Sequence, residues 1–135
     1  MGGMHMGIGV IGVVGAGTMG TGIAQVAAAS GFEVKVFDEF EAARQRSIAA
    51  IQRLSASSVA KGRSTEEERA AMLARLCYAD DLGELADADL VVEAVTEVFD
   101  VKLDIFRRLD ALLAPGAILA SNTSSMSITA LAAVT

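Results

Sequence analysis

Residues 11–38 read IGVVGAGTMGTGIAQVAAASGFEVKVFD, and this stretch decides the fold. The β-branched run over residues 8–14 predicts a strand buried on both faces. Apolar side chains then recur at helical spacing and predict a helix that ends at Gly31; these are Met19, Ile23, Val26 and Ala27. Residues 33–37 alternate charged and apolar side chains, which predicts a second strand with Asp38 at its tip.

The loop between the first strand and the helix, Gly15-Ala16-Gly17-Thr18-Met19-Gly20, fits the pattern G-x-G-x-x-G. Gly15 permits a tight turn, Gly17 lets a pyrophosphate approach the backbone, and Gly20 lets the helix pack close to the strand. The N–H groups and the positive dipole end of the helix would then hold the phosphates. The six loop residues are therefore predicted to bind a dinucleotide.

Asp38 lies 18 residues after Gly20, at the end of the second predicted strand. A carboxylate there can accept hydrogen bonds from ribose hydroxyls, while a 2′-phosphate would meet like charge. The predicted cofactor is therefore NAD rather than NADP. Two alternatives remain open: a loop that only turns the chain, and an S-adenosylmethionine methyltransferase, against which the third glycine argues.

The rest of the chain continues the alternation of helices and strands. A long helix through Ile51 is broken at residues 61–63, and a capping box of Ser64 with Glu67, or Thr65 with Glu68, predicts a further helix that carries Met72, Leu73 and Leu76. Later strands are expected within residues 89–95 and at 117–120, with helices over 98–112 and 128–134. This order predicts an α/β, Rossmann-type doubly wound fold, with a mainly parallel sheet and a helical insertion after the second strand.

Length and charge bound the function. The 135 residues suffice for one domain, expected over residues 7–135 after a lead-in at 1–6, and the net charge of −6 argues against a nucleic-acid partner. Residues 1–32 carry no Lys, Arg, Asp or Glu, but ten glycines and the missing positive start argue against a membrane span or signal peptide. Cys77, the one cysteine, is expected to be buried and inert. The protein is expected to be cytoplasmic, and no metal site is predicted.

Four stretches give the sequence a family resemblance. They are residues 11–38, "VAKGRSTEEE" at 59–68, "DADLVVEAVTEVFDVK" at 87–102 and "APGAILASNTSSMSITALA" at 114–132. Together they resemble the N-terminal domain of the L-3-hydroxyacyl-CoA and 3-hydroxybutyryl-CoA dehydrogenases. The resemblance implies oxidation of a 3-hydroxyacyl-CoA to the 3-ketoacyl-CoA, with hydride passing to NAD. A non-catalytic NAD-binding module remains the alternative.

The resemblance also assigns roles to single residues. Glu97 and Lys102 match cofactor contacts, and Asn122 matches a loop residue near the cofactor. Ser124 matches the serine that lies between nicotinamide and substrate and hydrogen-bonds the reacting oxygen. Lys61 matches a lysine associated with the CoA moiety of the acyl-CoA substrate.

One part of the family pattern has no counterpart here. The family continues with a catalytic histidine and a C-terminal helical domain that makes the homodimer, whereas the only histidine of this chain is His5. Removing the hydroxyl proton needs a group that titrates near neutrality. We therefore expect this chain to bind NAD without turning over substrate.

Overall fold

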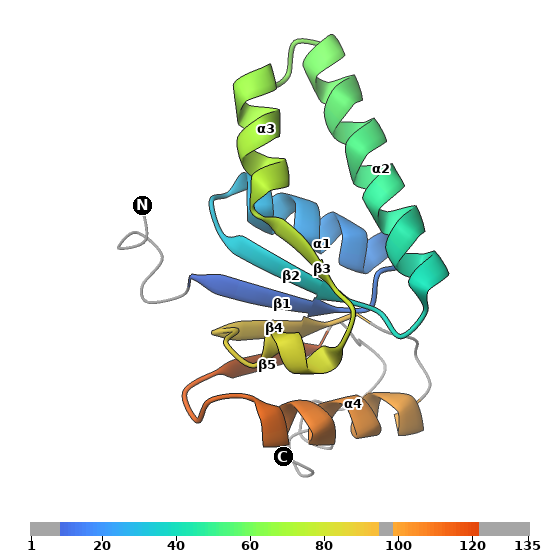
Figure 1. Ribbon diagram of the computed structural model, residues 1–135, viewed down its shortest axis with the longest axis vertical. Helices are drawn as coiled ribbons and strands as arrows, with labels where there is room; N and C mark the ends of the chain where they lie inside the picture. Colours follow the sequence, from blue (N-terminus) through green and yellow to red (C-terminus); the bar gives the residue numbers. More distant parts are fainter. Residues whose placement is uncertain (1–8, 95–98, 122–135) are drawn as a thin grey trace.

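The computed structural model describes residues 9–94 and 99–121 and contains a five-stranded parallel sheet (Figure 1). The strands are β1 (Val10–Val14), β2 (Glu33–Phe37), β3 (Leu76–Ala79), β4 (Leu90–Glu93) and β5 (Ile118–Ser121). Their order is β3-β2-β1-β4-β5, and every neighbouring pair is parallel. The predicted Rossmann-type fold is confirmed, and its reversal of strand order falls between β1 and β4.

Helices cover both faces of the sheet. On one face, α1 (Thr18–Ala29), α2 (Glu41–Ala60) and α3 (Glu66–Ala74) enclose a core that includes Val34, Val36 and Ile51. On the other face, the 3-10 helix η2 (Leu82–Leu85) and α4 (Phe99–Leu112) pack on Val14 and Val91. In Figure 1, α2 and α3 form a hairpin that extends beyond the sheet.

Helix α1 packs on the sheet through small residues. Its buried positions are Gly20, Thr21, Ala24 and Ala28, whereas Met19 and Val26 are 55% and 68% exposed. The predicted apolar stripe was therefore wrong for these two residues, because the helix lies too close to β1 for large side chains to fit between them. The predicted helix end is confirmed: Gly31 has φ 105°, and the amides of Gly31 and Phe32 donate to the carbonyls of Ala28 and Ala27.

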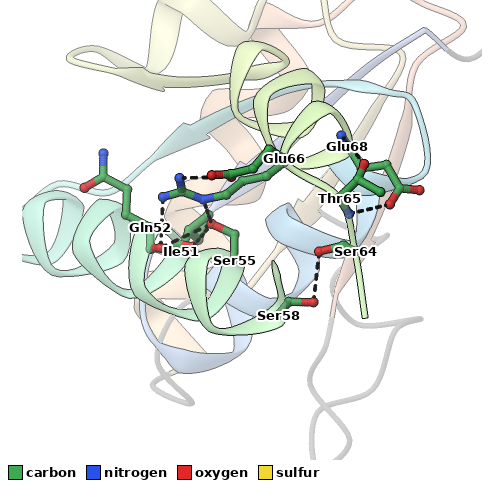
Figure 2. Close-up of polar contacts among 9 residues, drawn as sticks. Ile51, Gln52, Ser55, Ser58, Ser64, Thr65, Glu66 and Glu68 are labelled. Carbon is green, nitrogen blue, oxygen red and sulfur yellow. Dashed lines mark hydrogen bonds and ion pairs between the residues drawn. The ribbon is translucent and has the colours of Figure 1, made fainter. Parts of the chain in front are cut away.

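The second capping box is the one that forms. Thr65 Oγ1 accepts from the Glu68 amide at 3.1 Å, and Glu68 Oε1 accepts from the Thr65 amide at 2.8 Å (Figure 2). These reciprocal bonds satisfy backbone donors that the start of a helix leaves without partners. They fix where α3 begins and therefore the length of the hairpin loop.

Strand β3 and helix η2 were not predicted. Leu76 was assigned to the preceding helix, but α3 ends at Ala74 and Leu76 begins the strand. Cys77 is exposed rather than buried, because β3 is an edge strand. Cys77 lies beside Lys35 in the register, and the side chain of Lys35 is itself partly exposed.

The helix expected over residues 128–134 and residues 122–127 before it lie outside the described residues. Among the helices described, none combines the length and apolar character needed to cross a membrane.

Candidate dinucleotide-binding site

The glycine loop lies at the carboxyl end of β1, next to the point where the strand order reverses. Gly15 has φ 107°, a conformation that side chains rarely adopt, and its amide donates to the Phe37 carbonyl at 2.8 Å. A Cβ on Gly20 would lie 1.7 Å from the Gly15 carbonyl oxygen. The loop is therefore tied to β2 on one side and pressed against α1 on the other.

The start of α1 offers a place for an anion. No side chain caps this helix, and its first turn contains no acidic residue. Gly17, at the N-cap, has φ −77°, and a Cβ built on it would meet no atom within 4 Å. Open space in front of the end of a twelve-residue helix fits a pyrophosphate that approaches the backbone.

Asp38 connects the loop to the end of β2. Its Oδ2 accepts from the Ala16 amide at 2.8 Å, and its Oδ1 accepts from the Phe40 amide at 2.9 Å. Arg44 Nη1 donates to the Asp38 carbonyl, 2.6 Å away. Because each carboxylate oxygen has two lone pairs, Asp38 can hold the loop and still accept from a ribose hydroxyl.

Three hydroxyl groups form a chain behind the loop, in which Thr21 and Ser47 are buried and Tyr78 is partly buried. Thr21 Oγ1 lies 3.3 Å from the Ala16 carbonyl and 2.7 Å from Ser47 Oγ, which lies 2.6 Å from the Tyr78 hydroxyl. A carbonyl only accepts, so Thr21 donates to Ala16, Ser47 donates to Thr21 and Tyr78 donates to Ser47. Burial raises the pKa of Tyr78 above its usual value of 10.0, which keeps the phenol in this donating form.

Two cavities flank the loop. One, of about 260 Å³, is lined by Gly15, Gly17 and Asp38 together with Phe40 and Arg108, and suits the adenosine end of a dinucleotide. The other, of about 630 Å³, runs from Gly17 and Thr18 between α1 and α2, past Arg46 and Arg53.

The structure brings the six loop residues and Asp38 together. Lys61 lies apart from them, at the C-cap of α2 in the hairpin. Lys102 is in α4, but its side chain, like Glu97, Asn122 and Ser124, lies outside what the structure describes.

One acidic residue near this region was not predicted. Glu93 ends β4 opposite Val14 and is fully buried. An acid closing the apolar run Leu-Val-Val-Glu was the available signal, whereas the predicted cofactor contact was Glu97, four residues further along the chain.

Comparison with known proteins agrees with this geometry. Residues 10–135 match the family model described as the NAD-binding domain of 3-hydroxyacyl-CoA dehydrogenase. The chain belongs to this family. The NAD-binding domain is 49% identical over 126 residues to a 3-hydroxybutyryl-CoA dehydrogenase of Bradyrhizobium diazoefficiens, a match that covers 93% of the chain and 43% of the relative.

Further relatives give the same result. The domain is 41% identical to the mitochondrial hydroxyacyl-coenzyme A dehydrogenase of Sus scrofa, covering 91% of the chain and 41% of that protein. It superposes on the crystal structure of the (S)-3-hydroxybutyryl-CoA dehydrogenase from Ralstonia eutropha with a TM-score of 0.91 at 42% identity. That match covers 95% of this chain and 45% of the other, so the NAD-binding domain spans less than half the length of these relatives.

Proposed function

We propose that this chain is the NAD-binding part of an oxidoreductase that interconverts L-3-hydroxyacyl-CoA and 3-ketoacyl-CoA. The observation that carries the proposal is the open helix N-terminus at Gly17 beside the Asp38 carboxylate. NAD, when bound, accepts or returns the hydride. The substrate assignment rests on the relatives, which are named for 3-hydroxybutyryl-CoA and hydroxyacyl-coenzyme A.

The chain's own residues would bind and orient the cofactor. The loop residues Gly15, Ala16, Gly17, Thr18, Met19 and Gly20 would present the end of α1 to the pyrophosphate. Asp38 would accept from the adenosine ribose, in the 260 Å³ cavity. Like charge at Asp38 disfavours a 2′-phosphate, which supports NAD over NADP.

The acyl-CoA substrate would approach along α2. Arg46 and Arg53 are seven residues apart on one side of the helix and line the 630 Å³ cavity that begins at the loop. Lys61 follows eight residues after Arg53, so helical spacing brings it to the same side. Three cations along this side would suit the phosphates of CoA.

The remaining residue roles follow from the family resemblance. Glu97, Lys102 and Asn122 would contact or organise the cofactor, and Ser124 would hydrogen-bond the reacting oxygen. The proton-accepting histidine would lie beyond this chain, which by itself would bind NAD without turnover. The complete cytoplasmic enzyme would dimerise through the helical domain.

Calorimetry with NADH, NADPH and S-adenosylmethionine tests cofactor choice. We expect NADH to bind more tightly than NADPH and S-adenosylmethionine not to bind. Failure of NADH to bind would contradict the proposal, while S-adenosylmethionine binding would favour the methyltransferase alternative, which already disagrees with the family.

Catalysis is tested separately, with NADH and acetoacetyl-CoA, by following absorbance at 340 nm. The expected result is no steady oxidation of NADH by the 135-residue chain. Turnover would show that the proton-transferring group lies within it. Joining the chain to the histidine-bearing remainder of a relative should produce activity, and a failure to do so would favour the non-catalytic module.

A further inference from the structure

The α2–α3 hairpin contains a cavity whose lining shares no residue with the 260 Å³ cavity at Asp38. Its volume is about 430 Å³, and it lies between α2, α3 and the second half of α1. Its charged lining consists of Arg63, Arg69, Arg75 and Glu68. The lining carries three positive charges and one negative charge, and the Glu66 carboxylate, 4.0 Å from Arg69, adds a second negative charge beside it, so the local balance is still positive in a chain whose net charge is −6.

Two of these arginines are held in place by neighbouring groups. Arg69 donates from Nε to Ser55 Oγ at 3.0 Å and from Nη2 to the Gln52 carbonyl at 3.2 Å, and its Nη1 lies 4.0 Å from Glu66 Oε1 (Figure 2). Arg75 Nη1 donates to the Ala28 carbonyl at 2.7 Å. A guanidinium carries five N–H donors, so each keeps donors beyond these bonds while its position is fixed. Such fixed groups lose little freedom when a ligand binds.

The third arginine has no such partner. Within residues 9–94 and 99–121, the Arg63 side chain forms no hydrogen bond or ion pair. Arg63 follows Gly62, whose φ of 74° turns the chain between the two helices of the hairpin. The arginine at this turn therefore remains available to an external anion.

Serine hydroxyls add neutral donors. Ser64 Oγ donates to Ser58 Oγ at 3.1 Å, as Figure 2 shows, which leaves the Ser58 hydroxyl proton free of this contact. The Glu68 carboxylate on the same lining accepts from the Thr65 amide in the capping box. Arginine and hydroxyl donors together are the usual recognition groups for a phosphate.

We propose that this cavity binds the phosphate group of a small phosphorylated molecule. Its volume leaves room for more than a phosphate, so a phosphate ester or diphosphate fits better than a free inorganic ion. The cavity includes Ser55 and Ser58 of α2, which face away from the side that carries Arg46 and Arg53. The cavity therefore lies on the opposite side of α2 from Arg46 and Arg53, and it approaches the path proposed for CoA at Gln25, which lines both cavities, and at the hairpin turn, where Lys61 precedes Arg63 by two residues.

An NMR titration of the ¹⁵N-labelled chain with inorganic pyrophosphate tests this site. Saturating NADH keeps pyrophosphate from the glycine loop. Whether or not NADH binds, the amides whose chemical shifts change tell binding at the hairpin cavity from binding at the glycine loop. We expect the amides of Ser58, Arg63 and Ser64 to shift, and Arg63→Gln to weaken pyrophosphate binding about tenfold. Arg107→Gln, an equal charge change on the exposed side of α4, should leave binding unchanged.

Three outcomes would overturn the proposal: shifts confined to residues 15–20, equal weakening by both substitutions, or no binding. Comparing CoA with 3′-dephospho-CoA then identifies the source of the phosphate. If the hairpin amides respond to neither compound, CoA is not the ligand, which supports a separate phosphorylated molecule. A response to CoA, with or without its 3′-phosphate, would overturn the claim of a site separate from CoA.

Discussion

Replacing Gly17 with alanine should separate cofactor binding from folding. A Cβ at this position meets no atom within 4 Å, and φ −77° with ψ −164° suits alanine. Loss of flexibility in the unfolded chain favours the variant by about 0.4–1 kcal/mol, while alanine is a poorer N-cap than glycine by a similar amount. The free energy of unfolding should therefore change by less than about 1 kcal/mol.

NADH affinity should respond differently. The added methyl group occupies the space in which the pyrophosphate is expected to approach the α1 amides. Loss of one charge-assisted hydrogen bond costs about 2 kcal/mol, which corresponds to a roughly thirtyfold higher Kd. Urea unfolding and calorimetry with NADH, on the same preparations, measure the two effects.

Two further glycine substitutions serve as controls. Gly116→Ala makes the same chemical change at a distant turn where a Cβ also meets no atom within 4 Å, so both stability and affinity should persist. Gly20→Ala should lose both, because its Cβ would lie 1.7 Å from the Gly15 oxygen. An unchanged NADH affinity in Gly17→Ala would refute the placement of the pyrophosphate at this helix end.

Three other predictions concern single side chains. Asp38→Ala should narrow the preference for NADH over NADPH, and an unchanged preference in calorimetry would show that Asp38 does not contact the ribose. The same substitution should lower the free energy of unfolding by about 2 kcal/mol, because two backbone hydrogen bonds are lost. Tyr78 is the only tyrosine, so absorbance at 295 nm should report a phenol pKa above 10.0. The free energy of unfolding should then fall as pH rises above 10.0, and Tyr78→Phe should remove this loss. A phenol that titrates at its usual pKa would contradict the hydroxyl chain. Hydrogen bonds from the Gly9 and Val10 amides lower the pKa of Asp89, so its contribution to stability is present above pH 3.8 and is lost as pH falls through the lower folded pKa. The urea midpoint of Asp89→Asn should therefore vary less over this acid range than that of the unsubstituted chain, and equal variation would count against these bonds.

The sequence predicted the structure best where a local signal is compatible with only one local conformation. Gly31 ends α1 with φ 105°, and residues 33–37 form β2 as predicted, because a helix stop and a period-two pattern are local signals. The geometry of the glycine loop could be predicted for the same reason. Close packing at Gly20 requires the absence of a side chain, and that absence is visible in the sequence.

Features that depend on distant contacts were missed. Leu76 continues the helical spacing of Met72 and Leu73, and only pairing with β2 makes residues 76–79 a strand. The exposure of Cys77 follows from its place at the sheet edge, which no local pattern reveals. The double role of Asp38 was likewise only half predicted, since its bond to the Ala16 amide joins residues 22 positions apart.

The hydroxyl chain behind the loop gives the helical insertion a role beyond its length. Ser47 in α2 and Tyr78 in β3 reach the Ala16 carbonyl through Thr21, while Asp38 holds the amide of the same residue from the other side. Both backbone polar groups of Ala16 are therefore fixed from elements that follow the loop in sequence. Because α2 is the first helix of the hairpin and β3 follows its second helix, a shift of the hairpin relative to the sheet would change the hydrogen bonding of the loop. Cofactor affinity should therefore depend on hairpin position, although no residue of α3 lines either cavity at the loop.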